Sequence, residues 1–288
     1  MSQEVTSLAS GNEGTLSDQF RAYVLRLKGG EMGALPAVFA TIVLALVFEL
    51  LSPFFFTRIN FTNLFVQAAE LTMLSSALVF VIILAEIDLS AGVTAGVAMA
   101  VFIQLIKAWH WNWILALGAG LIVGLLIGWV IGFMVAKIGV PSFVVTLAFF
   151  LGFQGMQLVL LGEGGVYRVE VPAVIAIMNN NLPAWGGWLL LLVCAVASFL
   201  ISVWDRARRA KYNLVNKPFS IVLIRLFVLI GIGGISIQIM NQNRSQGAIP
   251  ISGVPIVVPI TIAIMAVATF VLDRTKFGRH LYAVGGNP

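Results

Sequence analysis

The sequence predicts an all-α fold, a polytopic bundle of transmembrane helices, and three observations lead to this prediction. Of the 288 residues, 60% are hydrophobic and only 10% carry a formal charge, whereas water-soluble domains carry about 25% charged residues. Apolar runs recur at lengths near the ~20 residues that a helix needs to cross a bilayer. Lys and Arg are unevenly distributed between these runs. The composition excludes a soluble enzyme and a nucleic-acid-binding protein as descriptions of the whole chain, whose surface must largely face lipid.

The chain divides into a polar start, an apolar middle and a polar end. Residues 1–34 are predicted to be a cytoplasmic tail with a short amphipathic helix around Leu16–Leu27. Residues 35–272 form the predicted transmembrane domain, and residues 273–288 a cytoplasmic segment. About eight spans are expected between them, at Leu35–Phe56, Leu64–Ala85, Ala91–Ile106, Trp113–Ala136, Phe143–Leu161, Gly187–Trp204, Phe219–Met240 and Gly253–Leu272.

These spans differ in how clearly the sequence marks them. The fourth contains no charged residue and is the clearest. The second is weaker because Gln67 and Glu70 lie in it, and the third is short, so these two could form a broken or re-entrant pair. With the N-terminus inside, twelve Lys and Arg lie in cytoplasmic segments and four in outer ones, while Arg225 lies within a span. This asymmetry predicts that both ends are cytoplasmic, and it accounts for the net charge of +5 without a nucleic acid partner.

Small residues recur every fourth position in two of the predicted spans. Such spacing lets helix backbones approach closely in lipid, so we expect these residues to mediate helix packing within one subunit. They are Gly92, Gly96 and Ala100 in the third span, and Gly120, Gly124, Gly128 and Gly132 in the fourth.

Several kinds of chemistry are not expected. The sequence lacks the G-x-x-x-x-G-K-[ST] run of a P-loop, so this chain is not expected to hydrolyse nucleotide by itself. His110 and His280 lie outside the predicted spans, on opposite sides, which argues against an intramembrane serine protease. With these two His and the single Cys194, no metal site is predicted.

An ion-coupled carrier is weakened but not eliminated. Such carriers bury chains of acidic or His residues within the membrane. Here the ionisable residues near membrane depth are all expected toward the ends of spans. They are Glu49, Glu70, Glu86, Asp88 and Arg225.

Three motifs stand out from the apolar background, and the first lies between the second and third spans. Residues 86–92 read Glu-Ile-Asp-Leu-Ser-Ala-Gly. Asp88 or Ser90 can accept hydrogen bonds from the free N–H groups at the start of the next helix, and a carboxylate there suits the helix dipole. A capped turn is therefore favoured over direct contact with a transported molecule, although both residues are candidates for a substrate pathway.

The second motif opens the fifth span with Pro141-Ser142-Phe143, and Thr146 follows one turn later. Gln154 and Gln157 are three residues apart and share a helix face. Amides inside a bundle either hydrogen-bond sugar hydroxyls or join helices, and the sequence leaves both possibilities open. Gln67, Thr146, Gln154 and Gln157 complete the candidate pathway.

The third motif is the polar end of the chain, residues 273–288. An inside-facing basic segment explains its charges, but not its two aromatic residues and its paired glycines, which are typical of a docking element. The candidate docking residues are Phe277, Gly278, Arg279, Tyr282, Gly285, Gly286 and Asn287.

At these motifs the sequence resembles the permease subunits of bacterial sugar ABC importers of the ribose/xylose/arabinose type. The likeness covers roughly Phe61 to Pro288 and is most specific in the third motif. Within that family the xylose type is the most similar, because the basic loop Trp204–Lys217 and the additional span Phe219–Met240 resemble its insertion.

The resemblance implies a permease that carries a pentose, D-xylose first, across the bacterial inner membrane. It also implies three partners: a cytoplasmic ATPase subunit that docks on the third motif, a periplasmic sugar-binding protein and a second permease copy. ATP would be bound by the ATPase, and this chain would hold no cofactor of its own.

Two residues depart from the family pattern, and the ending differs as well. Glu86 stands where glycine is usual, and Ala91 replaces a common valine. Because the family continues beyond the position of Pro288, the chain is expected to be C-terminally truncated. The alternatives are a secondary carrier or channel that works without an ATPase, and a membrane scaffold with no transport role.

Overall fold

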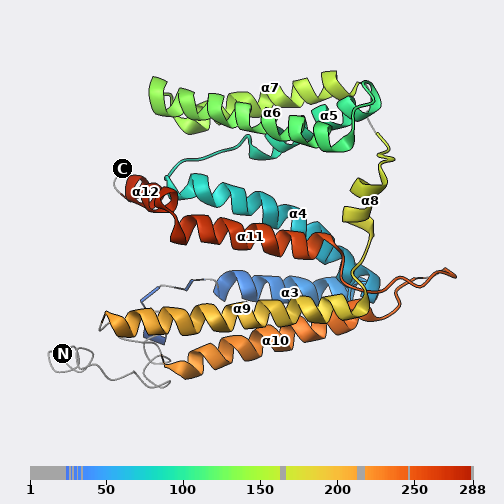
Figure 1. Ribbon diagram of the computed structural model, residues 1–288, viewed down its shortest axis with the longest axis vertical. Helices are drawn as coiled ribbons and strands as arrows, with labels where there is room; N and C mark the ends of the chain where they lie inside the picture. The colour runs from blue at the N-terminus through green and yellow to red at the C-terminus, as the bar shows by residue number, and fades with distance from the viewer. Residues whose placement is uncertain are drawn as a thin grey trace. The chain divides into compact units, whose positions relative to one another are not determined.

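The computed structural model describes residues 24, 25, 27, 29, 30, 32, 33, 35–162, 167–212, 218–245 and 247–286. Most of the N-terminal tail, including most of the amphipathic helix expected around Leu16–Leu27, lies outside these residues, as do Asn287 and Pro288. Within the described ranges the elements are helices, without a β-strand, which confirms the all-α prediction (Figure 1). They are α3 (Leu35–Leu51), α4 (Arg58–Ile83), α5 (Ala91–Lys107), α6 (Trp113–Phe133), the π-helical turn η1 (Met134–Ile138), α7 (Ser142–Leu161), α8 (Pro172–Asn179), α9 (Ala184–Lys211), α10 (Phe219–Asn241), α11 (Val257–Arg274) and α12 (Lys276–Gly285).

Each of the eight predicted spans coincides with one of these helices. Among the described residues, six helices are long and apolar enough to cross a membrane, namely α4, α6 with η1, α7, α9, α10 and α11. The other two, α3 and α5, are apolar helices of 17 residues each. At 1.5 Å per residue, 17 residues measure about 25 Å, slightly less than a bilayer core. The polytopic bundle is therefore confirmed.

Some predicted helix ends are wrong, for reasons of local chemistry. The first predicted span runs on to Phe56, but α3 stops at Leu51 because Pro53 cannot continue a helix. By contrast, α4 begins at Arg58 and continues without a break for 26 residues, so a broken helix is wrong there. The start of the predicted loop Trp204–Lys217 is helical, because α9 continues to Lys211. The short helix α8 has no counterpart among the predicted elements.

The chain forms two compact units, described separately below. Unit 1 comprises the described parts of Met1–Leu64 and of Asn181–Val254, and unit 2 comprises those of Phe65–Asn180 and of Pro255–Pro288. Helix α4 begins in unit 1 and continues into unit 2.

In unit 1, α9 and α10 run side by side and pack through glycines (Figure 1). A Cβ added at Gly187 of α9 would lie 3.1 Å from the Ile237 side chain, and one added at Gly233 of α10 would lie 2.7 Å from Leu191. Such close backbone approach is what small residues provide between helices in lipid. The guanidinium of Arg206 stacks 5.5 Å from the ring centroid of Phe219, joining the end of α9 to the start of α10.

At the other end of unit 1, Arg244 ties the segment after α10 together. Its guanidinium donates to the carbonyl of Met240 at 2.7 Å, to that of Gly253 at 3.1 Å and to Oδ1 of Asn181 at 2.6 Å. Burial lowers the pKa of Arg244 below its ordinary value. Because Arg presents several donors in a fixed planar fork, one side chain fixes three separate parts of this loop.

In unit 2, α5 packs against both α6 and α7. A Cβ at Gly120 of α6 would lie 2.9 Å from the carbonyl oxygen of Ala98 in α5. A Cβ at Gly96 of α5 would lie 2.7 Å from the amide of Gln157 in α7. Two of the glycines predicted to mediate helix packing therefore do so.

Candidate functional site

The connection between α4 and α5 forms a compact turn around Asp88. Oδ1 of Asp88 accepts hydrogen bonds from both the backbone N–H and the hydroxyl of Ser90, each at 2.7 Å. Ser90 is fully buried and its side chain makes no capping hydrogen bond to α5. Of the two residues expected to accept hydrogen bonds at the start of α5, Asp88 does so, from the N–H of Ser90 directly before the helix. Ser90 does not, because its hydroxyl donates to Asp88.

Helix α7 holds this turn in place from the side. The N–H of Ile87 donates to Oγ of Ser142 at 3.2 Å. The hydroxyl of Thr146, a residue only 1% exposed, lies 3.2 Å from the carbonyl of Ile87 and 2.9 Å from that of Ser142. The structure thus brings together Asp88, Ser90 and Thr146, which belong to two motifs whose contacting residues Ile87 and Ser142 are 55 positions apart in the sequence.

The three glutamines of the candidate pathway have different environments. Nε2 of Gln157 donates to the carbonyl of Val93 at 2.9 Å, and the same amide packs on Gly96. This is the helix-joining role that the sequence left open. Gln154 in α7 and Gln67 in α4 are both exposed, and neither takes part in the turn around Asp88.

A cavity of about 550 Å³ lies beside this turn, within unit 2. Helices α4, α5 and α6 form its walls, together with Asp88. Its lining residues are Glu70, Met73, Leu74, Ala77, Asp88, Ala91, Gly92, Thr94, Ala95, Ala98, Gly124, Ile127, Gly128 and Ile131. Most of this surface is apolar or glycine, and its polar groups are two carboxylates and one hydroxyl.

The cavity corrects two expectations from the sequence. Glu70 is the thirteenth of the 26 residues of α4, so it lies at the middle of the helix and not toward its end. Gly124 and Gly128 line the cavity, and an added Cβ would meet no atom within 4 Å at either position. These two glycines therefore do not mediate helix packing in unit 2, in contrast to Gly120.

The candidate docking segment folds as the short helix α12, which follows α11 after the extended residue Thr275 (Figure 1). Oγ1 of Thr275 caps the helix by accepting from the N–H of Gly278 at 3.2 Å. Gly278 and Leu281 are buried, and an added Cβ at Gly278 would collide with the carbonyl oxygen of Leu272. Gly278 is thus required by the corner between α11 and α12.

The rest of α12 has one side that packs on α4 and another that is exposed. Gly285 lies directly against the carbonyl of Ile83, the last residue of α4. The ring of Phe277 lies 6.5 Å from that of Phe80, centroid to centroid. The remaining candidates, Arg279, Tyr282 and Gly286, are exposed. A partner could therefore reach the side chains of Phe277, Arg279 and Tyr282, the first of which is 58% exposed.

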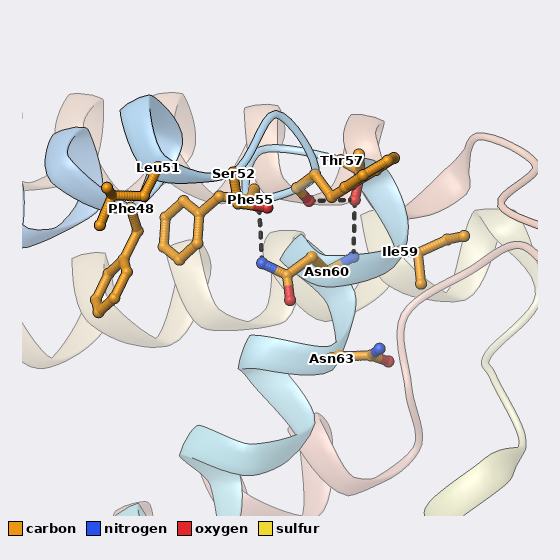
Figure 2. Close-up of a pocket in the computed structure, with 9 residues that line it drawn as sticks. Phe48, Leu51, Ser52, Phe55, Thr57, Ile59, Asn60 and Asn63 are labelled. Atoms are coloured by element: carbon orange, nitrogen blue, oxygen red, sulfur yellow. Dashed lines mark hydrogen bonds between the residues drawn. The ribbon is translucent and has the colours of Figure 1, made fainter.

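A second hollow, of about 460 Å³, lies in unit 1 where α3 joins α4 (Figure 2). Figure 2 shows that Asn60 points across this turn, where its Nδ2 donates to the carbonyl of Phe55 at 2.7 Å. The backbone N–H of Asn60 donates to Oγ1 of Thr57, which donates in turn to the carbonyl of Phe54. These polar groups satisfy one another, so the hollow is explained by the turn. Within the described residues, no cluster of His, Cys, Asp and Glu could hold a metal ion.

Comparison with known proteins gives these features a context. Residues 60–201 match the family described as the permease component of branched-chain amino acid transport systems. Over these residues, just under half of the chain, the sequence is similar to that permease family. The match and the six long apolar helices make it a multi-pass protein of the inner membrane. No solved structure matches the chain.

The curated relatives are sugar permeases. The xylose transport system permease protein XylH of Escherichia coli (strain K12) is 32% identical over 232 residues, which are 79% of this chain and 56% of the relative. XylH of Haemophilus influenzae is 30% identical over 234 residues, 79% of this chain and 58% of the relative. The D-allose transport system permease protein AlsC of E. coli K12 is 23% identical over 251 residues, which are 83% of this chain and 74% of the relative. The chain thus spans just over half the length of the xylose permeases that it matches.

Proposed function

We propose that this chain forms part of the membrane permease of an ABC importer that carries a pentose, D-xylose first, across the bacterial inner membrane. The names of the relatives supply the substrate class. The observation that carries the proposal is the contact between the two functional elements of unit 2: the exposed helix α12 packs on the last turn of α4, directly before the turn that borders the cavity.

The proposed cycle follows from this contact. A separate cytoplasmic ATPase binds ATP and docks on the side chains of Phe277, Arg279 and Tyr282. When it closes, it displaces α12, and Gly285 transmits the displacement to Ile83. Two-state motions of this kind rely on packed elements that move as units. The turn around Asp88 then changes position at the cavity wall, while this chain performs no covalent chemistry.

Two further partners complete the proposal. A periplasmic sugar-binding protein delivers the pentose to the opposite end of the spans, and a second permease copy completes the membrane assembly. The remaining candidate residues Gly286 and Asn287 belong to the docking segment by sequence, and Asn287 lies outside the described residues.

The second candidate function is a carrier that is driven by an ion gradient without an ATPase. One observation favours it: Glu70 lies at the middle of a membrane-spanning helix, where ionisable residues commonly belong to ion or proton pathways. The sequence placed the ionisable residues toward span ends, which argued against a carrier. The central position of Glu70 in α4 removes part of that argument.

Reconstitution distinguishes the two functions. The importer containing this chain is placed in proteoliposomes with its ATPase and its sugar-binding protein, and uptake of radiolabelled D-xylose is measured. Uptake that requires ATP and the ATPase supports the importer. Uptake by the permease alone under a proton or sodium gradient would replace it with the carrier.

A further inference from the structure

The cavity in unit 2 contains a carboxylate in an unusual place for a membrane helix. Glu70 is about 20 Å from either end of α4 at 1.5 Å per residue. Placing an acidic side chain at the centre of a membrane helix costs about 3 kcal/mol on insertion scales. Within the described residues Glu70 makes no hydrogen bond or ion pair. A residue with this cost and no structural partner suggests a functional role, and Glu70 lines a cavity in which a ligand could contact it.

Two other polar groups of the lining also have bonding capacity left. Asp88 uses Oδ1 for both bonds from Ser90, so its second oxygen remains an acceptor. The hydroxyl of Thr94 is buried without any hydrogen-bond partner. An ionised carboxylate can accept hydrogen bonds but cannot donate them, whereas a threonine hydroxyl both donates and accepts. The three groups lie on α4, the 84–90 connection and α5, so they reach the cavity from separate parts of its wall.

The remaining walls are apolar: they consist of glycine, alanine and the larger side chains of Met, Leu and Ile residues. Gly92, Gly124 and Gly128 leave open space where a Cβ would stand. The volume of about 550 Å³ falls in the range of roughly 300–1,000 Å³ typical of small-molecule sites. Apolar walls with a few acceptors suit a neutral polyol, whose C–H faces pack on the apolar residues while its hydroxyls donate to carboxylates.

A resident metal cation fits this cavity less well. Hard cations require several oxygen ligands in a closed shell at about 2.0–2.6 Å. No group of three or more His, Cys, Asp and Glu that could hold a metal occurs in the part of the chain that the structure describes.

We propose that the cavity between α4, α5 and α6 is a sugar-binding subsite of the transport pathway, in which Glu70, Asp88 and Thr94 bind the hydroxyls of a neutral monosaccharide. This inference rests on the proposed function and deepens it. Glu70 is the residue that determines affinity, because it is the mid-membrane group with no other partner. Charge-assisted hydrogen bonds of this kind are about twice as strong as neutral ones.

The first test fills the cavity in the reconstituted importer. Gly128→Leu places a side chain in the open space, and we expect ATP-driven D-xylose uptake to fall at least tenfold. Gly132→Leu is the matched control, because Gly132 lies one turn further along α6, also with no atom within 4 Å of an added Cβ, but outside the cavity lining. We expect Glu70→Gln to raise the xylose concentration for half-maximal uptake at least fivefold, and Glu86→Gln to leave it unchanged.

The second test does not depend on uptake. In a Cys194→Ser background, which removes the single cysteine, a cysteine is introduced by Ala95→Cys, at an exposed position of the cavity lining, and is treated with a small water-soluble thiol reagent. We expect labelling that saturating D-xylose slows at least threefold and that equimolar sodium or potassium chloride does not slow. Gly132→Cys should show no protection by xylose.

The outcomes separate this inference from the proposed function. If the wild-type importer takes up no xylose with ATP, the proposed function fails. If wild-type uptake is normal while Gly128→Leu and Glu70→Gln match the wild type, the subsite is overturned alone. Protection of the cysteine by salt in place of xylose would overturn it in favour of an ion site.

Discussion

Gly278→Ala is the sharpest test of the corner between α11 and α12. The new Cβ would lie 2.5 Å from the carbonyl carbon and 2.6 Å from Cα of Leu272, and it would collide with the carbonyl oxygen. Ordinary contacts of a Cβ lie at 3.4–4 Å. All three atoms belong to the backbone, so no flexible side chain can move aside. Helix α12 must therefore retreat by about 1 Å or more.

The cost has two parts. Overpacking of a tight site costs about 1–3 kcal/mol. A retreat also stretches the 3.2 Å bond from the N–H of Gly278 to Oγ1 of Thr275, and loss of an N-cap costs about 1 kcal/mol. If about 2 kcal/mol of this cost destabilises the native position of α12, the population of that position falls about 30-fold, at 1.4 kcal/mol per factor of ten. The coupling of ATP hydrolysis to uptake is expected to fall by the same factor.

ATP-driven uptake and ATP hydrolysis are measured together in proteoliposomes, with the amount of permease in the membrane checked by quantitative blotting. We expect Gly278→Ala to reduce xylose transported per ATP hydrolysed. Gly231→Ala in α10 is the control, because an added Cβ there meets no atom within 4 Å. A Gly278→Ala permease with wild-type coupling at wild-type abundance would refute the tight corner. The larger Gly278→Trp is a poorer probe of docking, since it would disrupt the corner itself.

Three further predictions address single contacts. Arg279→Glu reverses an exposed charge on α12, so we expect at least tenfold less ATPase to co-purify in mild detergent, at unchanged permease abundance. Thr146→Val removes the hydroxyl that contacts the carbonyl of Ile87, at a cost of about 1–2 kcal/mol. We expect the Tm in detergent to fall by about 2–6 °C, while Thr146→Ser stays close to wild type. An equal Tm for both variants would contradict this contact. Arg244→Met leaves three acceptors without their shared donor, and we expect the loop after α10 to lose about 3 kcal/mol of stability. Limited proteolysis should then cut this loop faster than in the control Arg58→Met, because the native Arg58 side chain makes one such bond, at 3.2 Å.

The spans were predictable because hydropathy alone determines which segments can cross lipid. Their ends were not, since they depend on single residues. Helix α4 starts at Arg58 although Asn60 and Thr62 are polar. Thr62 bonds back to the carbonyl of Arg58 at 2.9 Å, so a polar side chain is accommodated inside the helix. A hydropathy scan places the start of the span too late for this reason.

The site was less predictable because its parts come from three helices. The periodic glycines of α6 look identical in sequence, yet Gly120 contacts α5 while Gly124 and Gly128 line a cavity. The difference depends on where the neighbouring helix lies, which no spacing reveals. Glu70 was noticed but placed near a helix end, and Thr94 gave no signal, since a lone threonine in an apolar span usually bonds to its own backbone.

The two contacts of α12 with α4 constrain how this helix can move. One lies at its first turn, through Phe277 and Phe80, and the other at its last residue, through Gly285 and Ile83. A rod held at one end can swing about that end, but a rod held at both ends must slide or roll along with its support. In the proposed cycle, a force on α12 would therefore reach α4 as an axial push or a twist.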